Sequence, residues 1–178
     1  MFDVIVDALK NGGLKKEDKT KFYNQLLSAV KNIHDAGVVH RDIKLENIFV
    51  HNGNLKLADF GFSRIFMGEG ATVFSDTIGT LGYMAPELFS HEIYCGVKVD
   101  IYAMGIILFM IISGQQIYNT DKSDMIKDPR HNKFYKRFME NPMGVCRVRK
   151  IKAPETIMML IRDMIMVNPE DRPSLDQI

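Results

Sequence analysis

The chain has 178 residues, a length that suits one domain or a large lobe of a bigger one. Hydrophobic residues make up 46% and charged residues 25%, which excludes a disordered or low-complexity chain. The formal net charge of +1 gives no electrostatic reason to expect a nucleic-acid-binding protein, and the basic run at residues 147–152 is interpreted as a solvated surface.

The N-terminal half predicts one long helix, a hairpin and a long loop. Five apolar residues recur at helical spacing, and we expect the helix to end at Gly37: Phe22, Leu26, Leu27, Val30 and Ile33. Two β-like stretches, 47–50 and 55–58, flank the turn sequence 51–54, which predicts a hairpin. Residues 61–82 are rich in Gly, Ser and Thr without a period, so we predict a loop, and loops this long are usually functional.

The C-terminal half predicts two more helices. Residues 99–113 are apolar almost all round, which indicates a helix buried on most sides and ended by Ser113-Gly114. Residues 114–155 are polar and irregular, with a helix expected around 134–139. A last helix is predicted over 154–167, stopped by Asn168-Pro169, with an inner face of Ile157, Leu160, Ile161, Met164 and Ile165. The predicted fold is mainly helical with one small hairpin.

Cysteine usage and apolar stretches bear on location. Cys95 and Cys146 match no metal or redox spacing, which fits a reducing compartment. The N-terminus has no basic region before its apolar residues, so we predict no signal peptide. The longest apolar stretch, 101–112, is shorter than the about 20 residues of a membrane span. We therefore expect an intracellular, cytoplasmic protein with no membrane span.

Three short motifs occur in one order along the chain. The first is His40-Arg41-Asp42-Ile43-Lys44-Leu45-Glu46-Asn47, the second Asp59-Phe60-Gly61 and the third Ala85-Pro86-Glu87. Together they resemble the catalytic half of a protein kinase. The resemblance extends through Asp100 and Gly105 to Arg172, and so covers nearly the whole chain.

The resemblance implies a fold and a division of the chain. The expected fold is a protein-kinase-like C-terminal lobe, a helical bundle with a small β-hairpin at the catalytic cleft. Residues 1–178 would be part of a kinase catalytic domain, with a catalytic loop at 40–47, an activation segment at 59–87 and a buried helix at about 99–113.

Phosphoryl transfer from ATP explains the residue types at the centre of these motifs. Asp42 would accept or orient the proton of the substrate hydroxyl, and Lys44 would reach the transferring phosphate as a point charge. Asn47 and Asp59 supply hard oxygen ligands, which suit Mg²⁺, from opposite ends of one hairpin. Taken singly, an Asp or Asn in a loop is more often a turn former or a helix cap.

Substrate class follows from the same resemblance. A Lys two residues after the catalytic Asp is typical of serine/threonine kinases, as is the docking-loop sequence 79–87, in which Thr80 would bond Asp42 and Lys44. The hairpin and residues 59–63 resemble the calcium/calmodulin-dependent group. The residues expected to bind the cofactor are Lys44, Glu46, Asn47, Phe49 and Asp59, with Phe49 under the adenine. Glu46 also stands where basic-directed kinases often hold a substrate arginine.

Other motif residues are expected to be structural. His40 and Phe60 would stack, with Gly61 following them, and Glu87 would form a buried ion pair with Arg172. Asp100 would accept hydrogen bonds from the backbone of the catalytic loop, cap its own helix, or do both.

The presence of Arg41 predicts a negatively charged partner for it on the activation loop. In the family this Arg pairs with a phosphorylated residue three positions before the docking-loop glycine, and here that residue is Asp76. We hypothesise that Asp76 supplies a permanent negative charge for Arg41, the alternative being a solvated Asp in a loop. Ser75 and Thr77 flank Asp76 and are possible phosphorylation sites.

The small β-rich lobe that usually precedes these motifs is not recognisable. The sequence has no Gly-rich phosphate loop and no β3 lysine ahead of the catalytic loop, and residues 1–3 would lie just past the hinge between lobes. We therefore expect a truncated chain, weakly active or inactive alone, whose cleft floor is covered by the missing lobe or by a partner.

Two alternatives to a kinase lobe with a protein substrate stay open. One is a non-catalytic binding or regulatory module. The other is a metal-dependent phosphotransferase of another family, against which residues 79–87 argue because they would address a peptide.

Overall fold

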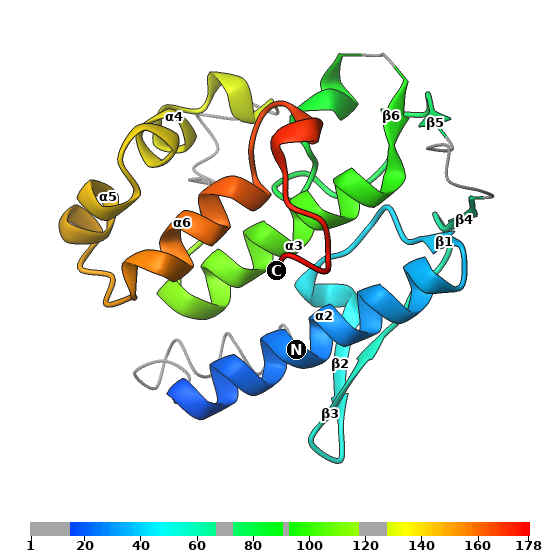
Figure 1. Cartoon of the computed structure of the whole chain (residues 1–178), viewed down its shortest axis with the longest axis horizontal. Coiled ribbons are helices and arrows are strands. Elements are labelled where there is room, and N and C mark those ends of the chain that lie inside the picture. The colour runs from blue at the N-terminus through cyan, green and yellow to red at the C-terminus, as the bar shows by residue number, and fades with distance from the viewer. Residues whose placement is uncertain (1–14, 67–72, 91–92, 118–127) are drawn as a thin grey trace.

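The helix α3 (Gly96–Ser113) forms the centre of the fold (Figure 1). The structure is a computed structural model that describes residues 15–66, 73–90, 93–117 and 128–178, so the expectation for residues 1–3 lies outside the described residues. α3 is apolar on almost every side, and it packs against α2 (Lys16–Asp35) and α6 (Glu155–Met164). The predicted buried helix is confirmed, and it begins three residues earlier than expected.

The length and hydropathy of α3 would also suit a membrane span. However, 78% of its 18 residues are buried inside the protein, which is the arrangement of a core helix. Gly105 allows a close crossing with α6, because a Cβ atom there would lie 2.7 Å from Cγ2 of Ile165 and 2.9 Å from Cβ of Met164. Gly114 ends α3 in the left-handed conformation, with φ of 69°.

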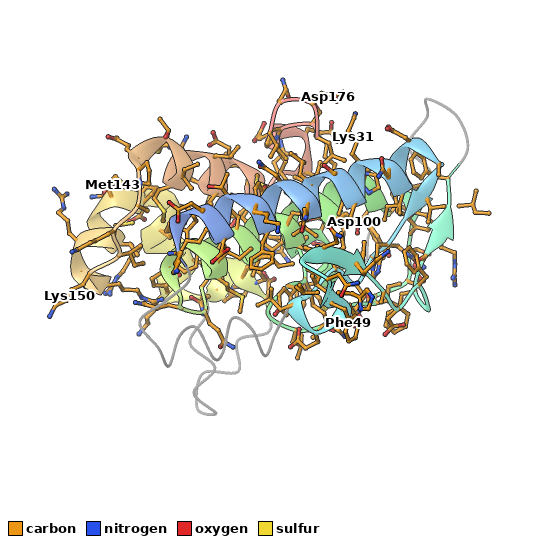
Figure 2. The ribbon with its side chains drawn as sticks, turned by 90° about the horizontal axis from the view of Figure 1, so that it is seen from below. Lys31, Phe49, Asp100, Met143, Lys150 and Asp176 are labelled. Atoms are coloured by element: carbon orange, nitrogen blue, oxygen red, sulfur yellow. The ribbon has the colours of Figure 1, made fainter. Side chains whose placement is uncertain are left out.

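α2 places its apolar stripe against this centre. Phe22, Leu26 and Val30 are buried, as their helical spacing predicts. Gly37 follows the end of α2 with φ of 72°, and its N–H donates to the carbonyl of His34 at 2.9 Å. The C-terminal residues return to α2, where Lys31 pairs with Asp176 at 2.6 Å (Figure 2).

The predicted hairpin is confirmed with bounds shifted by one residue. Strands β2 (Ile48–His51) and β3 (Asn54–Leu57) pair in antiparallel register, with Ile48 opposite Leu57. Asn52 and Gly53 both have positive φ, 50° and 73°, which is the conformation that a tight two-residue hairpin turn requires.

The prediction of an irregular loop over 61–82 is wrong in part. β4 (Arg64–Ile65) pairs with β1 (Val38–Val39), and β5 (Val73–Phe74) pairs with β6 (Tyr94–Cys95). Two-residue strands have no readable period, and their partners lie 20 or more residues away in the chain. Only the tertiary arrangement reveals them.

The stretch 114–155 contains more helix than its polar sequence indicates. The helix expected near 134–139 is α4 (Lys133–Glu140), and a second helix, α5 (Pro142–Arg149), was not predicted. Asn141-Pro142 suggests a turn, but the Asn141 side chain accepts a hydrogen bond from the N–H of Gly144 and caps α5.

α6 is shorter than predicted, and three of the five residues predicted for its inner face, Ile161, Met164 and Ile165, are buried. Met158, Ile161 and Met164 are buried, whereas Ile157 and Leu160 are only partly buried. Four short 3₁₀ helices complete the described elements: Leu45–Asn47, Pro86–Phe89, Pro129–His131 and Pro169–Asp171. The described part is thus mainly α with small antiparallel pairs, as expected.

Candidate active site

A buried carboxylate of α3 holds the backbone of the catalytic loop. Asp100 is 0% exposed, and its two oxygens accept hydrogen bonds from the backbone N–H groups of His40, at 2.9 Å, and Arg41, at 2.8 Å. Arg41 has φ of 66°, a strained value for a residue with a side chain. Asp100 lies in the second turn of α3 and does not cap it, since the cap position is Cys95. The capping interpretation is therefore wrong.

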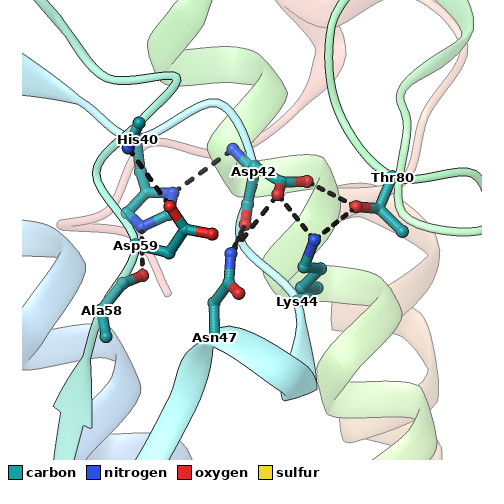
Figure 3. A network of polar contacts seen from close by, with 8 residues as sticks. His40, Asp42, Lys44, Asn47, Ala58, Asp59 and Thr80 are labelled. Carbon is teal, nitrogen blue, oxygen red and sulfur yellow. Dashed lines mark hydrogen bonds and ion pairs between the residues drawn. The ribbon is translucent and has the colours of Figure 1, made fainter.

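Asp42 lies at the centre of a polar network in this loop (Figure 3). Its Oδ2 accepts from Nζ of Lys44 at 2.8 Å, and its Oδ1 accepts from the hydroxyl of Thr80, also at 2.8 Å. Nζ of Lys44 also donates to the Thr80 hydroxyl at 2.8 Å, which closes a three-membered ring of contacts. The side chain of Asp42 is 3% exposed, so these contacts fix the direction of its carboxylate.

Asn47 and Asp59 could bind a divalent cation. Nδ2 of Asn47 donates to the backbone carbonyl of Asp42 at 3.0 Å and to Oδ2 of Asp42 at 3.3 Å (Figure 3). Both contacts use the amide nitrogen, so neither of them occupies Oδ1. Asp59 is exposed, and its φ of 63° directs the chain sharply out of the hairpin.

The oxygen donors of Asn47 and Asp59 fit Mg²⁺ bound together with phosphate. Mg²⁺ commonly takes one or two protein carboxylates and completes its shell with waters and substrate phosphates. The described residues contain no group of three or more His, Cys, Asp and Glu side chains that could hold a metal. Asn47 and Asp59 would therefore supply only two of the oxygen ligands, and phosphate oxygens and water would supply the others.

Three phenylalanines lie exposed around the hairpin and the segment after it. Phe60 contacts the ring of His40, with centroids 5.0 Å apart, yet 46% of it is exposed. Phe49 on β2 is 56% exposed and Phe62 is 45% exposed. The N–H of Gly61 donates to Oδ1 of Asp59 at 3.4 Å and closes the turn between Asp59 and Phe62.

Arg41 pairs with Asp76 of the activation segment. Nη1 of Arg41 donates to Oδ1 of Asp76 at 2.6 Å and to the hydroxyl of Tyr94 at 3.1 Å, while its guanidinium lies 4.5 Å from the ring centroid of Phe74. Partial burial acts to raise the pKa of Asp76, but the hydrogen bond and charge of Arg41 outweigh it and lower this pKa overall. Ser75 and Thr77 beside Asp76 are exposed.

The docking loop places Thr80 and Tyr83 on the other side of Asp42. Gly79 has φ of 123° and approaches the carbonyl of Arg41 closely, since a Cβ there would lie 3.3 Å from that oxygen. Glu46 lines a cavity of about 110 Å³ with Thr80 and Tyr83. Burial and then the charge of Glu46 raise the pKa of Tyr83. Glu46 therefore lies with the docking loop.

Glu87 and Arg172 form a bidentate ion pair that ties the docking loop to the C-terminal end. Both N–O distances are 2.7 Å, and the side chain of Arg172 is 0% exposed. Nε of Arg172 donates to the carbonyl of Met166, and Nη1 donates to that of Lys98, both at 2.9 Å.

Sequence reasoning missed two side chains of this network. Tyr94 bridges Arg41 and Asp76, and its hydroxyl donates to the backbone carbonyl of Asp76 at 3.0 Å. His34 at the end of α2 contacts Oδ2 of Asp100 at 2.8 Å. Both residues lie in the sequence as ordinary members of a strand or a helix, so no local signal distinguishes them.

Known proteins are similar to this chain over 64% to 100% of its length. The family described as protein kinase domain matches residues 1–178. A probable serine/threonine-protein kinase KIN1 homolog of Encephalitozoon cuniculi is 32% identical over 179 residues, which is 100% of this chain and 29% of that protein. The CBL-interacting serine/threonine-protein kinase 8 of Arabidopsis thaliana is 41% identical over 115 residues, 64% of this chain and 25% of that protein.

A third similar protein is the putative serine/threonine-protein kinase YPL150W of Saccharomyces cerevisiae. It is 37% identical over 159 residues, which is 89% of this chain and 16% of that protein. The chain therefore spans less than a third of the length of each of these three relatives.

Proposed function

Because the chain belongs to the protein kinase family, in its serine/threonine class, we propose that its catalytic loop transfers the γ-phosphoryl group of ATP to Ser and Thr hydroxyls of proteins. The observation that carries this proposal is the fixed carboxylate of Asp42, held by Lys44 and Thr80 at 2.8 Å each. A carboxylate with a defined direction can orient an incoming hydroxyl and accept its proton.

Lys44 and Thr80 would position the reaction on either side of this carboxylate. Nζ of Lys44 is within hydrogen-bond distance of both Asp42 and Thr80, so its positive charge lies where the transferring phosphate would approach the hydroxyl. The Thr80 hydroxyl donates to Asp42 and accepts from Lys44. These two hydrogen bonds fix the position of the carboxylate relative to the ammonium group. These contacts support the roles of general base, phosphate contact and positioning residue.

We further propose ATP and Mg²⁺ as cofactors. Mg²⁺ bound to ATP supplies charge neutralisation of the phosphates. Asn47 and Asp59 would hold the cation through their side-chain oxygens, and the exposed ring of Phe49 would lie under the adenine.

The exposed aromatic rings also support a covering element over the cleft. Phe49, Phe60 and Phe62, on the hairpin and the segment that follows it, each have more than two fifths of their surface exposed, and large exposed apolar side chains can mark a surface that binds another group. We propose that a second lobe or a partner covers them and completes the ATP site. The chain on its own would then bind ATP·Mg²⁺ weakly or not at all, and micromolar binding would refute that expectation.

The Arg41–Asp76 pair supports the proposal that the carboxylate of Asp76 takes the place of a phosphate group as the partner of Arg41. Asp76 provides a negative charge at 2.6 Å from the arginine, and Tyr94 fixes both groups. Ser75 and Thr77 are exposed, so phosphorylation could add to this charge.

We also propose an intracellular, cytoplasmic location. Cys95 and Cys146 are free thiols, which supports a reducing compartment. Imaging of a fluorescent fusion tests this, and secretion of the protein would contradict it.

The test of the catalytic proposal uses the full gene product and γ-labelled ATP. The acceptors are two peptide libraries, one carrying Ser and Thr and one carrying Tyr. We expect label on the Ser and Thr library, reduced by roughly two to three orders of magnitude in Asp42→Asn, because the proton acceptor is lost. The matched control is Asp163→Asn, which neutralises a half-exposed carboxylate on α6 that is paired with Arg162 and lies outside the catalytic motifs.

The exposed rings also favour one second candidate, a non-catalytic lobe that binds a partner through Phe49, Phe60 and Phe62. Transfer that is absent, or equal in wild type and Asp42→Asn, would reject the catalytic proposal. Partner binding that is lost in Phe49→Ala would then support the binding module.

A further inference from the structure

A cleft separates α4 from α5 at the end of the helical body away from the catalytic hairpin. Its volume is about 560 Å³, and residues of both helices and of the junction between them line it. In Figure 2, Met143 on α5 and Lys150 just after α5 lie at one end of the molecule, and Phe49 on β2 lies toward the other. We call this feature the α4–α5 cleft.

The charges lining the α4–α5 cleft are mainly positive. Lys133 and Arg137 come from one face of α4, four residues apart, and Arg149 comes from the end of α5. Glu140 is the one acidic side chain among the lining residues. Among the described residues, no ion pair involves any of these four groups.

Arg149 is held in place without a carboxylate partner. Its guanidinium lies 3.6 Å from the ring centroid of Phe134, and its Nη1 donates to the carbonyl of Gln116 at 2.9 Å. Desolvation by burial lowers the pKa of Arg149, which is the expected effect on a cation that has lost water and gained no anion. A preorganised guanidinium with spare N–H donors is suited to a carboxylate.

The walls of the cleft are apolar beneath these charges. Phe134, Val145 and Val148 line it, and Val148 is 85% exposed even though it is a branched apolar residue. Val145, three residues earlier on α5, is 9% exposed, so the apolar lining runs from a buried to an exposed side chain. An exposed apolar side chain beside unpaired cations calls for an occupant that carries both kinds of group.

We propose that the α4–α5 cleft binds a short segment of a partner protein in which acidic side chains alternate with a large apolar side chain. The carboxylates would contact Arg149 and Arg137, and the apolar side chain would pack on Val148 and Phe134. The charge of the cleft is complementary to such a segment, and a concave volume of about 560 Å³ accommodates a few side chains. The site is separate from the catalytic loop and does not depend on phosphoryl transfer.

The test measures fluorescence anisotropy of labelled peptides with the whole chain. The probe is a fluorescein-labelled decapeptide with the core Glu-Leu-Glu-Phe-Glu in a Gly-Ser frame. One control peptide replaces each Glu with Gln, and another replaces Leu and Phe with Ala. We expect binding of the probe at or below roughly 100 µM, and at least about tenfold weaker binding of both control peptides.

Variants with matched charge changes locate the site. Arg149→Gln should weaken probe binding by about tenfold, whereas Arg147→Gln, on the same helix but outside the cleft, should leave it unchanged. Since Arg149→Gln also removes the contact with Phe134, the pair Arg137→Gln and Lys136→Gln serves as a second comparison. Both residues are exposed on α4, and only Arg137 lines the cleft. Melting curves establish that each variant is folded.

Three results would overturn the proposal. The first is no binding of the probe at 1 mM, ten times the roughly 100 µM bound above. The second is binding that is equal in wild type, Arg149→Gln and Arg137→Gln. The third is binding of vesicles rich in anionic lipid, or of inorganic phosphate, in place of the peptide, because either would show that the cations serve a membrane or a free anion.

Discussion

Replacing Glu87 with alanine would leave the guanidinium of Arg172 buried without its counter-ion. The side chain of Arg172 is 0% exposed and that of Glu87 is 11% exposed, so water cannot replace the lost carboxylate without a rearrangement. Removing one partner of a buried ion pair costs about 3–5 kcal/mol of unfolding free energy. We expect the lower end, about 3 kcal/mol, because the carbonyls of Met166 and Lys98 still accept from Arg172.

The assay is thermal and urea unfolding followed by circular dichroism, since the chain has no Trp. A loss of about 3 kcal/mol lowers the melting temperature by roughly 6–12 °C in a protein of this size. The control is Asp163→Ala, which breaks the exposed pair between Arg162 and Asp163 and should cost less than about 1 kcal/mol.

A double variant tests whether the loss of stability comes from the unpaired charge or from lost packing. Glu87→Leu combined with Arg172→Leu should be less destabilising than Glu87→Ala, because no buried charge is left unpaired. If Glu87→Ala costs no more than Asp163→Ala, the pair does not tie the docking loop to the C-terminal end, and the reasoning from burial is wrong.

Three further predictions concern the same fold and site. Asp76→Asn should lower phosphotransfer by the full gene product several-fold, and equal activity in both proteins would sink the proposed role of this charge. Because the pKa of Asp76 lies below its usual 3.8, its contribution to stability is present above that pH and lost below it, so melting temperatures of wild type and Asp76→Asn should converge in acid. Thr80→Val should lower kcat by about tenfold with little change in KM for ATP, and a change in KM alone would contradict a positioning role. Gly105→Ala should destabilise the protein by about 1–3 kcal/mol, because the added methyl overlaps Ile165 and Met164. A rise in melting temperature, as helix propensity alone predicts, would show that α3 and α6 can separate.

Long elements with a clear period could be predicted from the sequence, and short paired elements could not. In α2 the buried residues recur with the helix turn, and in α3 a long run of apolar residues indicates a helix buried on most sides. β4 and β5 have two residues each and depend on partners far along the chain. α5 has eight residues and begins with Asn141-Pro142, a pair that turns and helix starts share.

The same division applies to the candidate site. Asp42, Asn47 and Asp59 stand in motifs close together in the chain, so their order alone indicates phosphate chemistry. Tyr94 and His34 take part because β6 and α2 bring them to Arg41 and Asp100. No motif marks such residues, since their roles depend on contacts with distant segments.

The sequence by itself determined the family, the central helices and the residues expected to meet phosphate and substrate. Local chemistry is sufficient for these, because helix periodicity and short motifs are properties of neighbouring residues. The tertiary structure decided that Asp100 supports the catalytic loop and does not cap α3, and that Asp76 lies 2.6 Å from Arg41. It also decided that α4 and α5 enclose a basic cleft. The first two depend on contacts between segments far apart in the chain, and the cleft depends on how two consecutive helices pack against each other, so none of them can be read from neighbouring residues alone.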